Sequence, residues 1–134
     1  MVKLNDDVKS IFAGVKIFSL ATASKAGVPN VVPVGMLFLQ PDDETVWIVD
    51  NFMDKTLTNL KENPKASFYI WSPEGADAYQ IKGTVTIENS GADYQKAVDI
   101  AHKKRETLPA KNLIKLKITD VFYVTSGPKA GKRV

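Results

Sequence analysis

The 134-residue sequence contains no cysteine and a single histidine, His102. Without cysteine the chain forms neither disulfide bridges nor zinc–thiolate sites, and thiol catalysis is excluded. Long hydrophobic runs are also missing, because no apolar stretch approaches the roughly 20 residues that a membrane-spanning helix needs. The first residues, MVKLNDDVKSIF, carry acidic side chains where a signal peptide has its apolar segment. We therefore expect a cytoplasmic protein with no membrane partner.

Two common catalytic motifs are missing as well. The chain has no Gly-x-Gly-x-x-Gly, which excludes a Rossmann dinucleotide site, and no serine in a Gly-x-Ser-x-Gly elbow. The acid pairs Asp6-Asp7 and Asp42-Asp43 fall at a helix start and in a turn, where solvated carboxylates are ordinary. The sequence therefore indicates no catalytic residue and no metal site.

The chain carries little excess charge, and the excess lies at one end. The formal net charge is +3, and the final segment SGPKAGKRV holds three basic residues and no acid, so the rest of the chain is neutral. A nucleic-acid-binding protein usually shows a basic face on its folded body. The charge pattern therefore does not favour a nucleic-acid partner.

Hydrophobic patterning predicts strands joined mostly by short turns, with three helices as connectors. The expected strands are residues 16–24, 28–39, 45–49, 66–71, 79–88 and 113–125. The expected helices are residues 4–13, capped by Asn5 or Asp6, residues 55–63, capped by Asp54, and residues 93–106. The chain shows no repeat, no linker and no alternating βαβ pattern. We therefore expect residues 1–134 to form one mainly β domain, an antiparallel sheet closing into a small barrel with peripheral helices.

Alternation within the last strand predicts which of its side chains point into the barrel. They are the apolar residues that stand at every second position of the strand, namely Ile114, Leu116, Ile118, Phe122 and Val124.

The second expected strand, VPNVVPVGMLFL, is apolar on both faces. A strand of an antiparallel barrel normally has one solvated face, so something must cover the other. A helix, a partner subunit and a flat ligand are the three candidates. Pro33 lacks an amide hydrogen and Gly35 permits close approach, so this strand leaves backbone groups free that could bind the edge of a planar heterocycle.

The stretch DNFMDKTLTNL, residues 50–60, follows a strand and begins a helix. The amide groups at a helix start attract anions, and Lys55 and Thr56 add a positive charge and a hydroxyl donor. Asp50 and Asn51, at the preceding strand end, are suited to bind a ligand lying across the strand. The stretch is therefore one of two things, a phosphate site or an ordinary helix start. The second alternative stays open because Lys-Thr pairs occur by chance at the start of many helices.

Several of these segments together resemble a known family. GVPNVVPVG has the pattern Gly-x-Pro-x-x-x-Pro-x-Gly, and DNFMDKT precedes LxNLxxNP; the YQIKG strand, the long helix and the SGPKAGK tail follow in order. This arrangement resembles the split-barrel FMN-binding proteins of the pyridoxamine 5′-phosphate oxidase-like superfamily. The resemblance covers nearly the whole chain and is most specific between Asp50 and Pro64.

The resemblance implies a six-stranded antiparallel split β-barrel of Greek-key type with about three helices. It implies an FMN-binding homodimer in which the partner subunit completes the cofactor site at the interface. The phosphate would be held by Lys55 and Thr56. The ring would lie along the backbone of two strands, at Val32, Pro33, Val34, Gly35, Val49, Asp50 and Asn51.

The resemblance therefore predicts a flavoprotein, an oxidoreductase or electron-transfer protein acting on a small molecule or a redox partner. Two alternatives stay open: a non-catalytic module that binds a ligand or partner, and a reductase that uses the deazaflavin F420. True pyridoxamine phosphate oxidases carry a substrate segment with arginine and histidine near the C-terminus, which this chain lacks. Some relatives bind haem, but His102 at a lysine-rich helix end is typical of a surface residue.

Overall fold

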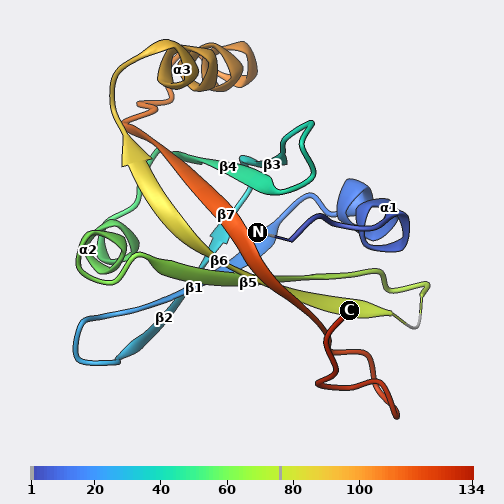
Figure 1. Cartoon of the computed structure of the whole chain (residues 1–134). Helices are drawn as coiled ribbons and strands as arrows, with labels where there is room; N and C mark the ends of the chain where they lie inside the picture. Colours follow the sequence, from blue (N-terminus) through green and yellow to red (C-terminus); the bar gives the residue numbers. More distant parts are fainter. Residues whose placement is uncertain (1, 76) are drawn as a thin grey trace.

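Seven antiparallel strands form one strongly curled sheet, a half-barrel, in the computed structural model, which describes residues 2–75 and 77–134 (Figure 1). The strands are β1 (Phe18–Ala23), β2 (Pro29–Val34), β3 (Leu37–Leu39), β4 (Thr45–Asp50), β5 (Lys65–Trp71), β6 (Ala78–Glu88) and β7 (Asn112–Tyr123). Their order is β2-β1-β5-β6-β7-β4-β3, so β7, the last strand of the β5–β6–β7 meander, returns to lie beside β4, which makes a Greek key. The expected mainly β, Greek-key split barrel is confirmed.

The prediction of six strands was wrong, because residues 28–39 form two strands instead of one. β2 pairs with β1 at one edge of the sheet, and β3 pairs with β4 at the other edge. The chain bends between them at Gly35 and Met36, and the Met36 carbonyl accepts a hydrogen bond from the Val49 amide at 3.0 Å. Pro33 and Gly35 are poor strand residues, which explains why the chain changes partner at this point.

In the part of the chain that the structure describes, three helices pack on the sheet: α1 (Asp6–Gly14), α2 (Lys55–Glu62) and α3 (Ala92–Lys104). The predicted cap of α1 is confirmed, since the Asn5 side chain accepts from the Val8 amide at 3.0 Å. α1 inserts Val8 and Phe12 into the half-barrel, where Phe12 meets the rings of Phe18 and Phe68 at 5.3 and 5.9 Å between centroids. α1 therefore belongs to the main core.

A second, smaller core joins α3 to β4 and β7 (Figure 1). Its buried residues are Met36, Val49, Ala97, Ala101, Leu108, Ala110 and Leu113. Small alanines on α3 let the helix lie close to the strands. This core brings the end of α3 near the end of β4.

The inward direction predicted for Phe122 and Val124 was wrong. β6 and β7 shift register at Lys82 and Gly83, so that Thr119 is an extra residue in β7. Such a β-bulge reverses the alternation beyond it. Val121 is consequently buried, whereas Phe122 is half-buried and Val124 is exposed.

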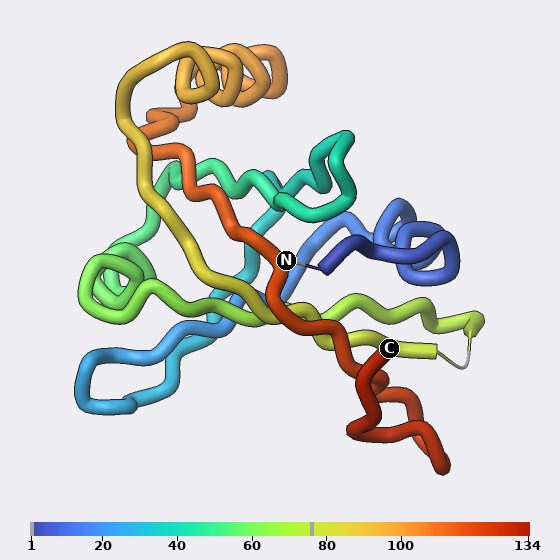
Figure 2. Tube along the Cα trace, in the orientation of Figure 1, coloured from blue at the N-terminus to red at the C-terminus, as the bar shows by residue number. Residues whose placement is uncertain are grey.

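The two ends of the chain both lie along β7 (Figure 2). The Val2 amide bonds to the Ile118 carbonyl at 2.9 Å, and the Val134 amide bonds to the Val121 carbonyl at 2.9 Å. Arg133 forms an ion pair with Asp120. Within residues 2–75 and 77–134 no helix is long and apolar enough to cross a membrane.

Candidate functional site

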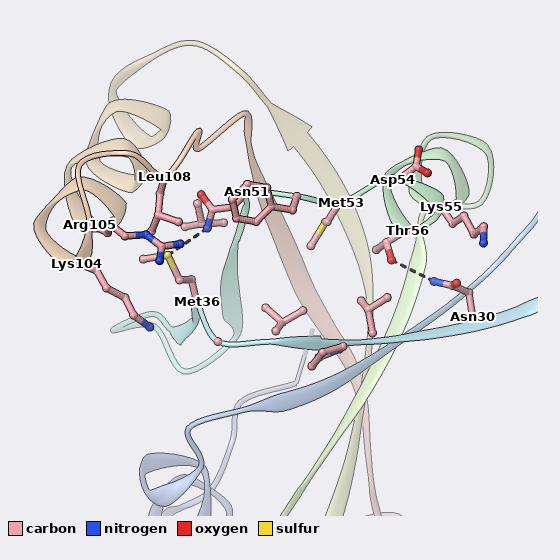
Figure 3. Close-up of a pocket in the computed structure, with 16 residues that line it drawn as sticks. Asn30, Met36, Asn51, Met53, Asp54, Lys55, Thr56, Lys104, Arg105 and Leu108 are labelled. Carbon is pink, nitrogen blue, oxygen red and sulfur yellow. Dashed lines mark hydrogen bonds between the residues drawn. The ribbon is translucent and has the colours of Figure 1, made fainter.

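A cavity of about 670 Å³ opens between β2, the end of β4, the start of α2 and the end of α3 (Figure 3). Eight of the nine predicted cofactor residues line it: Val32, Pro33, Val34, Gly35, Val49, Asn51, Lys55 and Thr56. These residues come from β2, β4, α2 and the turns that follow the two strands, so the fold brings together segments that lie apart in the sequence.

The middle of the cavity is apolar. Val32 and Val34 from β2 face Val49 from β4, and Met36, Met53 and Leu108 add to the wall. β2 is the first strand of the sheet order, so its outer backbone edge has no strand partner in the described part of the chain. An apolar wall beside a free strand edge suits a flat ring with hydrogen-bonding groups along one side.

α2 begins at one end of the cavity without the side-chain cap that the sequence predicted. Asp54 is the N-cap residue, but its carboxylate accepts no hydrogen bond from the helix. The physical reason is its backbone, since φ −124° and ψ −83° depart from the extended conformation that capping residues adopt. The amides of the first turn therefore remain available beside Lys55 and Thr56.

Thr56 is buried, with only 2% of its surface exposed, yet it lines the cavity. Its hydroxyl oxygen accepts a hydrogen bond from the Asn30 side-chain amide at 3.1 Å, which leaves the hydroxyl hydrogen free to donate. Asn30 also reaches the Thr22 hydroxyl at 3.4 Å. Asn30 was missed as a site residue, although a lone polar residue within VPNVVPVG is a signal that could have identified it.

The other end of the cavity is formed by Lys104 and Arg105, at the end of α3 (Figure 3). Nothing in the sequence pattern predicted that the end of this helix lies at the site. Neither residue belongs to the ion pairs found among the residues that the structure describes. The cavity thus carries positive charge at both ends, with Lys55 at one and Lys104 and Arg105 at the other.

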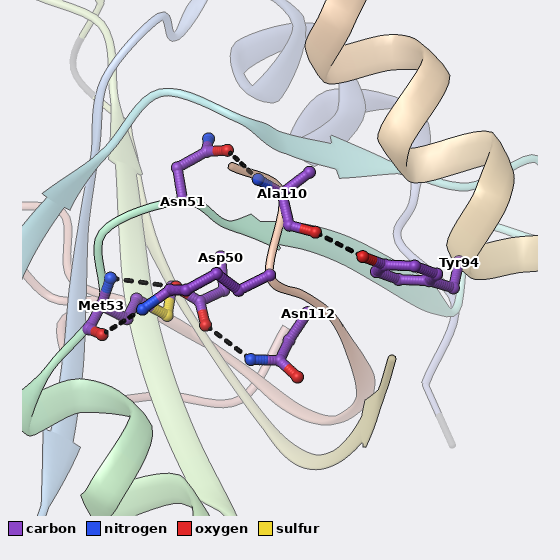
Figure 4. Close-up of polar contacts among 7 residues, drawn as sticks. Asp50, Asn51, Met53, Tyr94, Ala110 and Asn112 are labelled. Carbon is purple, nitrogen blue, oxygen red and sulfur yellow. Dashed lines mark hydrogen bonds and ion pairs between the residues drawn. The ribbon is translucent and has the colours of Figure 1, made fainter. Parts of the chain in front are cut away.

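Asp50, the ninth predicted residue, is not among those that line the cavity. Its side chain is fully buried and accepts hydrogen bonds from the Met53 amide at 2.9 Å and from the Asn112 side chain at 2.8 Å (Figure 4). Asn51, by contrast, does line the cavity, and its oxygen accepts from the Ala110 amide at 3.0 Å. The side chains of Asp50 and Asn51, neighbours at the end of β4, therefore point to opposite sides of the strand.

His102 lies outside the cavity lining, and its Nε2 donates to the Leu108 carbonyl at 3.0 Å. The described residues contain no cluster of three or more histidine, aspartate or glutamate side chains that could hold a metal ion. The site therefore combines apolar walls, backbone groups, polar side chains and basic residues at both ends, with the Asp54 carboxylate beside Lys55.

Comparison with known proteins identifies relatives of the whole chain. The sequence profile of the pyridoxamine 5′-phosphate oxidase family matches residues 4–125. The protein MJ0282 of Methanocaldococcus jannaschii is 35% identical over 135 residues, which cover 100% of this chain and 89% of that protein.

Solved structures share the fold. HupZ of Group A Streptococcus is 26% identical, with a TM-score of 0.81 and coverage of 96% of this chain and 99% of that one. An FMN-binding protein from Syntrophomonas wolfei is 20% identical, with a TM-score of 0.74 and coverage of 90% and 85%. At this level of identity the second likeness concerns the fold.

Proposed function

The chain belongs to the pyridoxamine 5′-phosphate oxidase family, and on that premise we propose that it is a flavoprotein that binds FMN in the cavity and acts as an oxidoreductase or electron-transfer protein. The observation that carries the proposal is the start of α2, which lines the cavity with Lys55 and Thr56 and has no side-chain cap from Asp54. Free amides, a positive charge and a hydroxyl donor together suit a phosphate group.

The apolar middle of the cavity supports the same ligand. Val32 and Val34 would pack against the flavin ring, and the backbone from Pro33 to Gly35 would meet its polar edge. Asn51 is held in place by bonds to Ala110 and to the Met36 sulfur, so its position is fixed before a ligand binds. Bound FMN would supply the redox chemistry, whereas the residues of the chain bind, orient and exclude water.

We propose further that two copies of the chain share the site. Phe52 lines the cavity with 72% of its surface exposed, and Ile17, 64% exposed, lies beside Gly35. Val31 on the outer face of β2 is also 64% exposed. Large apolar side chains around an open cavity favour a covering partner. A second copy would cover the outer face of the apolar β2, which the helices of this chain leave open.

A reductase that uses the deazaflavin F420 is the second candidate. Its cofactor carries a larger, phosphate-bearing tail, which needs more positive charge than Lys55 alone provides. Lys104 and Arg105 at the far end of the cavity supply that additional charge. A titration of the purified protein with FMN and with F420 separates the two candidates, because only the physiological cofactor should bind tightly and be reduced and reoxidised in turnover.

The replacement Lys55→Ala tests the phosphate site. We expect it to weaken FMN binding about ten- to a hundredfold, since a charge-assisted hydrogen bond contributes roughly 1.5–3 kcal/mol. Flavin fluorescence and visible absorbance measure the affinity, and circular dichroism checks the fold.

The matched control is Lys61→Ala, which removes an exposed lysine from the last turn of the same helix. FMN affinity should be unchanged in the control. Equal affinity of Lys55→Ala and the native chain would contradict the phosphate site. A colourless protein that takes up neither FMN nor F420 would contradict the proposed function, and binding without reduction by a nicotinamide donor would favour a non-catalytic module.

A further inference from the structure

The buried carboxylate of Asp50 stands at the end of β4, where an apolar residue would be the simpler choice. Burying a charge is costly unless it is paired, and a buried pair adds little stability compared with apolar packing. Asp50 is nevertheless fully buried and fully bonded. Its bond to the Met53 amide closes the turn of residues 50–53, which gives the carboxylate a geometric role.

Lys111 holds the same turn from its other side. Its Nζ donates to the Met53 carbonyl at 3.0 Å and lies 3.8 Å from the Asp50 carboxylate. Its backbone amide donates to the Asp50 carbonyl at 2.8 Å. Both backbone groups of Met53 are therefore bonded to one charged pair, which we call the Asp50–Lys111 clamp (Figure 4 shows the Asp50 side).

The clamped turn carries much of one cavity wall. Asn51, Phe52 and Met53 all line the cavity, and α2 begins at Lys55, two residues beyond Met53. The clamp consequently sets where the start of α2 lies relative to the strand β4. A shift of this turn would move the apolar wall and the cationic end of the cavity together.

We infer that Asp50 and Lys111 are positioning residues, which hold the turn 50–53 and the start of α2 in the geometry that binds the cofactor, and that the Asp50 side chain does not itself contact the cofactor. This inference rests on the proposed function for its binding readout. It gives the Asp50 side chain a role of its own, beside the backbone contact with the flavin ring that the resemblance implies at this residue.

The test uses Lys111→Met, which keeps the apolar stem of the side chain and removes its charge. We expect FMN to bind about tenfold more weakly and to dissociate faster, as for the loss of one charge-assisted hydrogen bond. The visible bands of the bound flavin should shift toward those of free FMN. Lys111→Arg should restore affinity, because arginine keeps the charge and the donors.

Lys9→Met is the matched control, because it removes an ion pair of 3.0 Å with Asp43 that does not touch the cavity. Asp50→Asn provides a second variant with an oxygen acceptor but no charge. In cofactor-free protein, hydrogen exchange of the Met53 amide should be about tenfold faster in Lys111→Met than in Lys9→Met.

The outcomes separate this inference from the proposed function. If the native protein binds FMN and the variants Lys111→Met and Asp50→Asn bind it with the same affinity, the positioning role is overturned. Native protein that binds no flavin would overturn the proposed function, and the Met53 exchange would then decide the clamp alone. Unchanged exchange in both variants would show that the pair does not hold the turn.

Discussion

Gly83 is the glycine at which the fold leaves least room for a side chain. A Cβ built at this position would collide with the Lys117 carbonyl oxygen and with the Leu116 side chain. The carbonyl belongs to the backbone of β7 and cannot turn aside. The β-bulge opposite Gly83 therefore depends on the absence of a side chain at this point in β6.

The replacement Gly83→Ala should destabilise the protein by about 1–3 kcal/mol, the usual cost of overpacking. Thermal unfolding followed by circular dichroism measures the change. Gly14→Ala is the control, because nothing lies within 4 Å of its Cβ position and alanine is preferred to glycine in a helix. The control should leave the melting temperature equal or raise it, and an unchanged melting temperature for Gly83→Ala would contradict the expected collision.

Single residues also show how far the site could be predicted from sequence. Lys55 and Thr56, which line the cavity, could be predicted as site residues. The reason is that a helix start is a local feature, visible in a few neighbouring residues. Lys104 and Arg105 reach it only because residues 105–111 return the chain from α3 to the end of β4. No local pattern encodes that return, so the second cationic end could not be anticipated.

Among the contacts between elements, Lys115 of β7 forms an ion pair with Asp93 at the start of α3. Its Nζ lies 2.7 Å from a carboxylate oxygen of Glu88 and 2.7 Å from one of Asp93. The same Nζ lies over the ring of Trp47, 5.8 Å from the ring centroid. The hydrogen bond from Lys115 lowers the pKa of Asp93 below 3.8. Hydrogen bonds to Asp93 and then Glu88 raise the pKa of Lys115 above 10.5.

The sign of each pKa shift gives the pH window of this stabilisation. The contribution of Asp93 is complete above its unfolded pKa of about 3.8 and is lost as the pH falls through its lower folded pKa. The contribution of Lys115 is complete below about 10.5 and is lost as the pH rises through its higher folded pKa. Between the two values the ion pair of Lys115 with Asp93 should be fully formed.

Lys115→Met should therefore lower the melting temperature by a few degrees within that window, and the difference from the native chain should shrink at both extremes of pH. Lys117→Met, on an exposed position of the same strand, is the control. Melting curves across the pH range measure both variants. A difference that does not change with pH would mean that lost packing, rather than the ion pairs, destabilises the variant.

Elements also show where sequence patterns stop predicting the fold. Alternation predicted β6 and most of β7, because each side chain there faces either core or solvent. The bulge at Thr119 could not be predicted, since it arises from the register shift against Lys82 and Gly83 in another strand. The division of residues 28–39 likewise depends on two different partner strands, β1 and β4.

For the whole molecule, the proposal of a shared site predicts a dimer that the face of β2 holds together. Val31→Lys places a charge at an exposed apolar position of that face, so the variant should be monomeric. Its FMN dissociation constant should rise at least about tenfold if the partner completes the site. Analytical ultracentrifugation and FMN titration measure the two effects.

Ile100→Lys is the control, because Ile100 is 39% exposed on α3 and does not line the cavity. It should remain dimeric with native affinity. If the Val31→Lys variant stays dimeric, the interface must lie on a surface other than the face of β2. A monomeric native chain that binds FMN tightly would contradict the shared site.

The position of β2 at the edge of the sheet has a further consequence for the chain as it is synthesised. An exposed strand edge can pair with the edge of another molecule and start aggregation. Pro29 and Pro33 remove two of the backbone donors that such pairing requires. The strand can thus keep an apolar surface, with Val31 exposed, while resisting the growth of intermolecular sheets. These prolines therefore lower the tendency of the free edge of β2 to pair with other molecules.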